Sequence, residues 1–366
     1  MSELGLNYRD ILLDFERVPE AISRRVEAFL SGATAGRRYV LGRNQHAHAL
    51  SQAIEIAGFV DDFAEDGTFW HGKPVIKIAD LDSDSTVVNC SMSISPVSAL
   101  VRLNASRSAA VLNYADLCRV RPDLIALPDF VQTTRKDFQE NEARLIRLYE
   151  RLADNHSRYV MQALAGYRLT GNPAYMMSFR VRFSDQYFEN FLNLTEAVFV
   201  DAGGFNGDTT EEFCKRYPAY KKIFLFEPSA KNINAARKRL SSYHDIDFVQ
   251  LGLSDSVGSL WFNPDAGSAS AVSAEGSERI LVTTLDSYID ERVTFIKMDL
   301  EGWELKALHG SAQHIAEDRP AMAISVYHNP SDYWQIYEYV IGIRDDYDVY
   351  LRHYTEGWSE TVMFFL

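Results

Sequence analysis

The chain has few cysteines, and this scarcity already restricts its chemistry. Cys90, Cys118 and Cys214 are its three cysteines in 366 residues, and they lie far apart with no C-x-x-C pair. Neither a disulfide framework nor a zinc site is indicated, and we predict no metal centre. Three scattered thiols are typical of a protein from the reducing cytoplasm.

Positive charge and long apolar runs are also scarce. The chain has 37 basic residues against 51 acidic ones, which gives a formal net charge of −14. Binding to bulk DNA or RNA depends on a basic surface, so no nucleic-acid partner is expected. No uncharged apolar run approaches the roughly 20 residues that cross a bilayer, and the acidic N-terminus lacks the apolar core of a secretory signal. We therefore predict a cytoplasmic protein with no membrane span.

Length and hydrophobic pattern predict two domains. A chain of 366 residues is longer than a domain with a single hydrophobic core usually is. Its composition, with 46% hydrophobic and 24% charged residues, is ordinary for a globular protein. Short apolar runs and helical spacing over residues 36–130 predict a small α/β domain, and the charged segment 134–164 predicts a connecting helix. The predicted boundaries are 1–132 for an N-terminal Rossmann-like accessory domain, 133–180 for a helical linker and 181–366 for a larger domain.

Strand and helix patterns alternate regularly from about Val181. The apolar runs VFVDA, KIFLFE, DFVQLGLSD, TFIKMD and AMAISVYH are separated by helical segments, which predicts a doubly wound α/β sheet. The last two runs, YDVYLRHYT and TVMFFL, alternate like an antiparallel pair at the edge of that sheet. Asp265 to Ser277 is small and polar and predicts a mobile loop.

The most informative stretch is VFVDAGGFNGDTT, in which an apolar strand ends on Asp201 and passes through glycines into a helix. Glycines let the backbone turn tightly and approach a ligand, and open α/β sheets bind ligands at the carboxyl ends of their strands. An acid before the glycines suits an ammonium group better than a pyrophosphate. The stretch predicts a site for a nucleotide-like cofactor. The loop glycines and the residues that can cap the helix are Gly203, Gly204, Gly207, Asp208 and Thr209.

Two further strand ends fit such a cofactor. Glu227 ends the next strand, where an acid hydrogen-bonds ribose hydroxyls, although it could instead cap the following helix. Enzymes that use NAD share this arrangement, so the pattern leaves the identity of the cofactor open. Leu253 and Ser254 end the third strand and could flank an adenine, whereas Ser-Asp after a strand is most often only a turn.

The fourth and fifth strands bring three titratable side chains to the same edge. If the fourth strand continues, Asp299 and Glu301 point to one side and can hold a positive centre, bind a metal or act as a general base. Glu301 could instead cap the next helix. His328 titrates near neutrality and can accept a hydroxyl proton. Asp299, Glu301 and His328 are therefore the candidate catalytic residues.

Ordered motifs from about Gln186 onward resemble the FkbM-type family of S-adenosylmethionine-dependent methyltransferases. They are VFVDAGGFNGDTT, IFLFEPS, GLSD, VTTLDSYI, TFIKMDLEGWELKALHGS, and AISVYHNPSD followed by YLRHYTEGWSETV. The resemblance implies a Rossmann-like methyltransferase sheet with S-adenosyl-L-methionine as cofactor. Asp201 and the Gly203 to Gly207 backbone would receive its methionine part, and Asp299 would face the reacting methyl. The implied cofactor-binding residues are Asp201, Gly203, Gly204, Asn206, Gly207, Asp208, Thr209, Glu227, Leu253 and Ser254.

The same resemblance implies an O-methyltransferase that modifies a hydroxyl of a sugar, a glycoconjugate or a related natural product. The N-terminal half more loosely resembles the Rossmann-like domain that precedes sugar-modifying acyltransferases, through GRNQHAHALSQAI, GFVDD and GKPVI. Two alternatives stay open: a nicotinamide-dependent sugar oxidoreductase and a non-catalytic cofactor-binding module. The expected partner is a small-molecule or glycan substrate, and a homo-oligomer could form through the N-terminal domain or the linker helix.

Overall fold

The structure is a computed structural model that describes residues 8–106, 110–262 and 278–366. Contacts between Cα atoms divide the chain into two compact units. The first unit consists of Met1–Glu142, Tyr159–Val181 and Tyr354–Ser359, and the second of Ala143–Arg158, Arg182–His353 and Glu360–Leu366. The predicted mobile loop at Asp265 to Ser277 lies outside the described residues. The predicted domain boundaries stay predictions.

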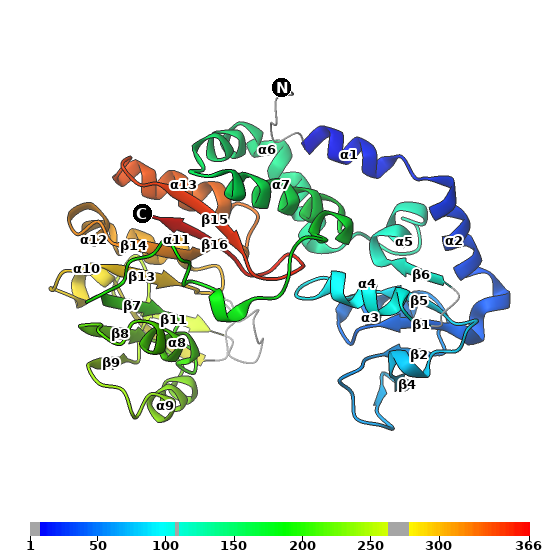
Figure 1. Cartoon of the computed structure of the whole chain (residues 1–366), viewed down its shortest axis with the longest axis horizontal. Coiled ribbons are helices and arrows are strands. Elements are labelled where there is room, and N and C mark those ends of the chain that lie inside the picture. The colour runs from blue at the N-terminus through cyan, green and yellow to red at the C-terminus, as the bar shows by residue number, and fades with distance from the viewer. Residues whose placement is uncertain (1–7, 107–109, 263–277) are drawn as a thin grey trace. The chain divides into compact units, whose positions relative to one another are not determined.

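The first unit contains a mostly parallel sheet with the strand order β3-β4-β2-β1-β5-β6, in which β3 pairs antiparallel with β4. Successive strands are added on one side of β1 and then, from β5, on the other, so β1 and β5 flank a topological switch point (Figure 1). Val87 and Val88 in β5 pack into different apolar clusters. Alternate side chains of a strand point to opposite faces of its sheet, so both faces of β5 are covered. The strands are β1 (Arg38–Leu41), β2 (Gly58–Val60), β3 (Phe69–Trp70), β4 (Lys73–Ile76), β5 (Thr86–Asn89) and β6 (Ala110–Asn113). Its helices before residue 121 are α1 (Tyr8–Glu16), α2 (Glu20–Leu30), α3 (Gln45–Ala53), α4 (Pro96–Asn104) and α5 (Tyr114–Val120).

A side chain organises the turn from β1 into α3. Gly42 has φ +111, and Asn44 then caps α3 by accepting hydrogen bonds from the backbone N–H groups of His46 and Ala47. The Asn44 amide also donates to the carbonyl of Cys90, just past β5, at 2.8 Å. A protein side chain thus ties together the two strand ends at the switch point.

The segment Tyr354–Ser359 completes the first unit beside the same switch point. Glu356, which is 1% exposed, accepts hydrogen bonds of 2.6 Å from both the backbone N–H and the hydroxyl of Ser98, in the first turn of α4. Its own backbone N–H donates to the carbonyl of Ile94 at 2.8 Å. A Cβ at Gly357 would lie 2.1 Å from the carbonyl oxygen of Ser93, so this approach requires glycine. The amino end of α4, where an open α/β sheet can bind an anion, therefore holds a carboxylate of the chain itself.

Replacing Glu356 with alanine is expected to lower the free energy of unfolding by about 1 to 2 kcal/mol, the usual cost of removing a helix cap. Urea denaturation followed by circular dichroism measures the change. Glu27→Ala, at an exposed position of α2, is the matched control and should change stability little. Equal stabilities of the two variants would contradict a capping role for Glu356.

Two helices stand where the sequence predicted one connecting helix over 134–164. They are α6 (Asp129–Arg151) and α7 (Asn155–Thr170). The break is specified locally, because Asp154 accepts hydrogen bonds from the backbone N–H and the hydroxyl of Ser157, at 2.7 and 2.6 Å, and so caps α7. Helical periodicity continues across the break, which explains why the pattern suggested a single helix.

The second unit contains a seven-stranded sheet with the order β15-β16-β14-β13-β7-β8-β9. The strands from β14 to β9 in this order are parallel, and β16 pairs antiparallel with both β14 and β15. The predicted α/β fold with an antiparallel edge is confirmed, and its switch point lies between β7 and β13. The strands are β7 (Val198–Ala202), β8 (Lys222–Phe226), β9 (Ile246–Val249), β13 (Phe295–Met298), β14 (Ala321–Ser325), β15 (Val349–His353) and β16 (Thr361–Phe365). The helices are α8 (Asp208–Arg216), α9 (Ala230–Arg239), α10 (Leu285–Tyr288), α11 (Glu304–His309), α12 (Ala312–Glu317) and α13 (Asp332–Ile343).

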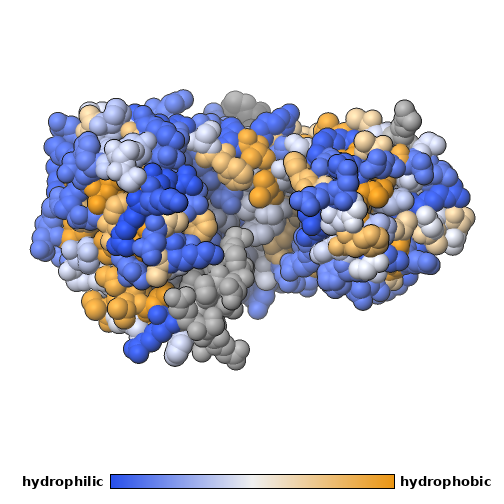
Figure 2. Space-filling view, turned by 90° about the horizontal axis from the view of Figure 1, so that it is seen from below, coloured by the Kyte–Doolittle hydropathy of each residue, from blue (hydrophilic) through white to orange (hydrophobic). Residues whose placement is uncertain are grey.

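The run DFVQLGLSD, predicted as one strand, divides between two sheets. Its first part forms β9, and Gly252–Leu253 forms β10 of a separate sheet with β12 (Glu278–Thr283) and β11 (Gly258–Phe262). This division depends on pairing with β12, a contact that local periodicity does not report. Across the described ranges, none of the helices has the length and apolar character needed to cross a bilayer. Hydrophilic residues cover much of the face in Figure 2, with hydrophobic ones between them.

Candidate active site

The glycine loop after β7 is packed tightly against the rest of the second unit. Gly203 has φ +77, and a Cβ there would lie 2.0 Å from the carbonyl oxygen of Asp299, at the end of β13. A Cβ at Gly204 would lie 2.4 Å from the Leu225 side chain in β8. Gly207 (φ +81) is the N-cap of α8. The sequence predicted glycines for approach to a ligand, and these contacts show that the loop also needs them to approach its own sheet.

Asp201 lies beneath this loop and is engaged by two protein groups. Its carboxylate is 0% exposed, accepts a 2.6 Å hydrogen bond from the Thr210 hydroxyl and lies 3.0 Å from the Lys297 ammonium. Burial would lower the pKa of Lys297, but the Asp201 carboxylate, together with those of Asp299 and Asp208, outweighs burial and raises the pKa. The ammonium also donates to the Gly203 carbonyl at 2.8 Å. Asp201 and Lys297 together therefore fix the start of the glycine loop.

Glu227 joins the glycine loop to the start of α9. Its carboxylate accepts hydrogen bonds from the backbone N–H groups of Phe205, at 3.1 Å, and Ser229, at 2.8 Å. Burial raises the pKa of Glu227, while these donors favour the ionised form. At the end of β10, the Ser254 hydroxyl accepts a 3.2 Å hydrogen bond from the indole of Trp303. The predicted ribose and adenine contacts of Glu227 and Ser254 stay predictions, and both side chains are held firmly in place.

The remaining polar loop residues lie at the start of α8. Asn206 accepts a 3.2 Å hydrogen bond from the backbone N–H of Asp208, and Asp208 accepts one of 2.8 Å from that of Thr209. These bonds satisfy donors that the first turn of a helix leaves free. The N-cap is Gly207, which has no side chain, so Asp208 and Thr209 do not cap α8 as predicted, and Asn206 and Asp208 instead bond to N–H groups of its first turn.

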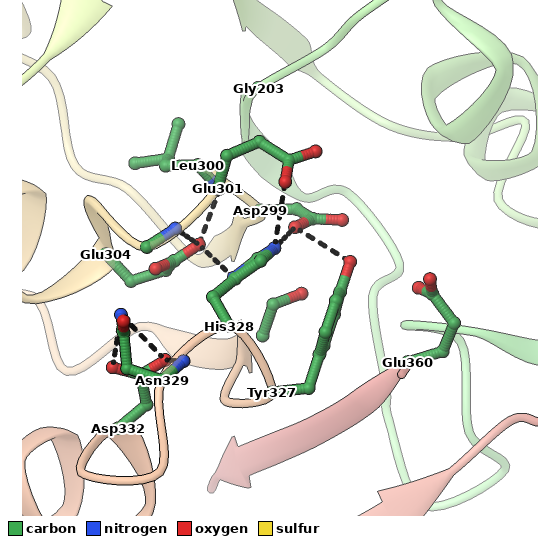
Figure 3. A network of polar contacts seen from close by, with 12 residues as sticks. Gly203, Asp299, Leu300, Glu301, Glu304, Tyr327, His328, Asn329, Asp332 and Glu360 are labelled. Carbon is green, nitrogen blue, oxygen red and sulfur yellow. Dashed lines mark hydrogen bonds and ion pairs between the residues drawn. The ribbon is translucent and has the colours of Figure 1, made fainter. Parts of the chain in front are cut away.

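Asp299, Glu301 and His328 come together as predicted, but by a different route (Figure 3). The strand β13 ends at Met298, and Glu301 adopts φ +53 in a turn, so strand alternation does not align the two carboxylates. The turn instead brings Asp299 Oδ1 and Glu301 Oε2 to 3.4 and 3.3 Å from His328 Nε2. Glu304 Oε1 lies 3.1 Å from His328 Nδ1 on the other side of the ring. The expectation of a continued strand was therefore wrong, whereas the proximity was right.

The carboxylates around His328 determine its protonation. Burial would lower its pKa, but the Glu304, Glu301 and Asp299 carboxylates outweigh burial and raise the pKa of His328 to about 11. The imidazole is therefore protonated at neutral pH, and in that form it has no lone pair for a substrate proton. The predicted role of His328 as a base stays a prediction, and it requires the ring to lose that proton first.

Sequence reasoning missed several residues that complete the site. The Tyr187 hydroxyl donates to Asp299 Oδ2 at 2.7 Å, and the Tyr327 hydroxyl lies 3.4 Å from Asp299 Oδ1. Glu304, rather than Glu301, accepts the backbone N–H groups of the turn, including that of Leu300 at 2.6 Å. An acid in the first turn of a helix was a usable signal for Glu304. Tyr187 precedes β7 by ten residues in an irregular segment, and no periodic pattern marks it.

Comparisons with known proteins concern the fold and the family of the chain. Residues 201–355 match the family model of the methyltransferase FkbM domain. An FkbM methyltransferase from Methylobacillus flagellatus matches with 24% identity and a TM-score of 0.73 over 99% of this chain and 100% of its own. A putative methyltransferase from Streptococcus mutans in complex with SAH matches with 13% identity and a TM-score of 0.31, over 47% of this chain and 89% of its own. Aeropyrum pernix fibrillarin with bound S-adenosyl-L-methionine matches with 9% identity and a TM-score of 0.34, over 52% of this chain and 76% of its own. No curated protein matches the chain.

The fold and the family model support a methyltransferase. Within that class, residues 201–355 match the FkbM methyltransferase domain, and the resemblance predicted from the sequence is confirmed.

Proposed function

We propose that this protein is an S-adenosylmethionine-dependent O-methyltransferase that acts on a hydroxyl of a sugar, a glycoconjugate or a related natural product. The observation that carries the proposal is the row of carboxylates at the carboxyl edge of one sheet, around the glycine loop. Asp201 lies near the end of β7, and Glu227 and Asp299 directly follow β8 and β13; these are the three strands at and beside the switch point. Because Asp201 is paired with Lys297, Glu227 and Asp299 are the carboxylates that favour a cofactor with ribose hydroxyls and a positively charged sulfonium.

We propose a part for each group. We propose that the Gly203 to Gly207 backbone receives the methionine part, that Glu227 binds the ribose hydroxyls, and that Leu253 and Ser254 flank the adenine. Asp201 supports the loop from below, because its carboxylate contacts Lys297 and Thr210. The bound cofactor supplies an electrophilic methyl on sulfur, and the protein aligns a hydroxyl with it.

The acceptor hydroxyl loses its proton as it attacks, and a partly exposed carboxylate beside His328 is available to take it. The Glu301 side chain is 30% exposed, the largest value among the four polar side chains that meet at His328. Burial raises the pKa of Glu301 toward the range in which a carboxylate is an effective base. We propose that Glu301 accepts the proton, and that Asp299 and His328 orient the reacting groups.

Calorimetry with S-adenosylhomocysteine and, in parallel, with NADH tests the cofactor. We expect S-adenosylhomocysteine to bind and NADH not to bind. Binding of NADH alone would favour the sugar oxidoreductase and overturn the proposal. A labelled-methyl screen of monosaccharides and oligosaccharides then tests the acceptor class, and binding without transfer to any of them would favour a non-catalytic module.

Glu301→Gln is expected to lower turnover of the acceptor found in that screen by about 100-fold or more, the usual contribution of a general base. Affinity for S-adenosylhomocysteine should stay within about twofold, because the substitution keeps size and removes only the charge. Glu317→Gln, exposed in α12, is the control and should leave turnover unchanged. Full activity of Glu301→Gln would remove Glu301 as the base.

The compartment also belongs to this proposal. Cys90, Cys118 and Cys214 are buried free thiols, and burial raises the pKa of each. Buried thiols with raised pKa values are poor nucleophiles, which agrees with a structural part for all three. We propose a cytoplasmic location on this basis and on the scarcity of cysteine.

A further inference from the structure

The polar cluster around His328 has the composition and spacing of a cation site. One ligand atom from each of Asp299, Glu304 and His328 lies within 4.8 Å of the other two. His328 Nε2 is 3.4 Å from Asp299 Oδ1, and His328 Nδ1 is 3.1 Å from Glu304 Oε1. Ligands bonded to one ion at about 2.1 Å lie about 3 Å apart when they are neighbours in its shell. These two carboxylates contact different ring nitrogens, and one ion bonds to only one of them, so a side chain must move before three ligand atoms that lie within 4.8 Å of one another close the shell.

Several buried polar atoms of this cluster have no hydrogen-bond partner among the described residues. Glu304 is 1% exposed, and nothing in the described part of the chain donates to its Oε2. The His328 side chain is 9% exposed, and neither ring nitrogen meets the geometry of a hydrogen bond, although carboxylate oxygens surround it (Figure 3). Buried polar atoms normally find partners, because an unpaired one costs free energy. The His328 nitrogens have carboxylate ion-pair partners, so Glu304 Oε2 is the buried atom of this cluster that points to a further group.

The charges around the cluster also favour a cation. Asp299, Glu301 and Glu304 bring three carboxylates to one imidazole, so even a protonated ring leaves net negative charge. Lys297 lies 3.0 Å from Asp201 and is engaged there. We propose that Asp299, Glu304 and His328 form a binding site for one divalent cation of the first transition row, such as Mn²⁺, whose binding displaces a proton from His328 to the solvent.

The donor set selects this class of ion. Two carboxylates suit hard cations such as Mg²⁺ and Mn²⁺, and an imidazole favours transition metals over Mg²⁺ and Ca²⁺. Three protein ligands leave open positions, as in metal sites that act on a substrate. A catalytic part for this site rests on the proposed methyl transfer. In that reaction, two neighbouring hydroxyls of a sugar would fill the open positions of the ion. Cation binding itself requires no substrate and is tested without one.

The test uses the full chain, stripped with a chelator and titrated with Mn²⁺. Electron paramagnetic resonance measures free Mn²⁺, and thermal melting measures stabilisation by the bound ion. We expect one ion per chain and a rise in Tm. His328→Ala and Glu304→Gln should each weaken binding by about tenfold or more and abolish the rise. His309→Ala is the matched control, because His309 is exposed on the same helix as Glu304, and it should bind Mn²⁺ like the wild type.

Each result of these measurements either supports or overturns the proposed cation site. Absence of stoichiometric Mn²⁺ binding by the wild type, or equal binding by a folded His328→Ala variant, overturns the proposal. Circular dichroism shows whether a variant is folded, and Glu304→Gln keeps the shape of the side chain if His328→Ala does not fold. Calorimetry with S-adenosylhomocysteine on the stripped protein separates the two proposals, since binding there without any Mn²⁺ binding leaves the methyltransferase proposal intact and removes only the metal.

Discussion

Lys297→Met is expected to lower the free energy of unfolding by about 3 to 5 kcal/mol, because it leaves the Asp201 carboxylate buried without its cation. The two side chains are 3% and 0% exposed, and their charged atoms lie 3.0 Å apart. The substitution also removes the donor to the Gly203 carbonyl. Urea denaturation measures the stability loss, and calorimetry with S-adenosylhomocysteine should show weaker binding because the glycine loop loses its support.

Lys222→Met is the control for this prediction. Lys222 begins β8 and lies 2.8 Å from Glu291 and 3.3 Å from Asp247, but these ion pairs are partly open to solvent. Pairs of this kind contribute up to about 1 kcal/mol. Adding Asp201→Asn to Lys297→Met should recover part of the loss, because no unpaired charge then stays buried. If Lys297→Met cost no more than Lys222→Met, the buried pair would not stabilise the fold.

Gly203→Ala is expected to weaken S-adenosylhomocysteine binding by about 100-fold, the size of effect that a displacement of about 1 Å can produce in a site. The new Cβ would lie 2.0 Å from the carbonyl oxygen of Asp299, and φ is +77, which an alanine adopts with strain. Either the loop or Asp299 must move, and both belong to the proposed site. Calorimetry with S-adenosylhomocysteine measures the effect.

Gly342→Ala is the matched control. Gly342 lies inside α13, and no atom lies within 4 Å of a Cβ added there. Alanine is the better helix former, so this variant should gain a little stability and keep its affinity. A Gly203→Ala protein that binds S-adenosylhomocysteine as tightly as the wild type would show that the loop tolerates a side chain.

Much of the second unit could be predicted from the sequence, because its strands and helices have strong local periodicity. The strand ending on Asp201, the alternation of strands and helices and the antiparallel pair at the end of the chain all follow from such patterns. The division of DFVQLGLSD between two sheets could not be predicted, since it depends on pairing with β12. The break between α6 and α7 depends on one cap at Asp154, a signal weaker than the helical spacing around it.

For the candidate site, the sequence predicted which residues meet but not how they are held. Placing Asp299, Glu301 and His328 at one edge required only the direction of parallel strands. The positive φ of Glu301, the partners of Asp201 and the part of Glu304 depend on tertiary contacts. Tyr187 reaches Asp299 across 112 positions of sequence, and no pattern near either residue indicates this contact.

The position of Glu356 in the chain has a consequence for biosynthesis. A ribosome makes the strands and helices of the first unit early, but Tyr354–Ser359 emerges only after almost all of the second unit. Until then the amino end of α4 lacks the Glu356 carboxylate, and the core cluster of the first unit lacks the contact with Trp358. The first unit therefore reaches its final structure late in translation. Expression of residues 1–181 alone should yield a less stable protein, and a peptide of residues 350–362 added in trans should restore part of that stability.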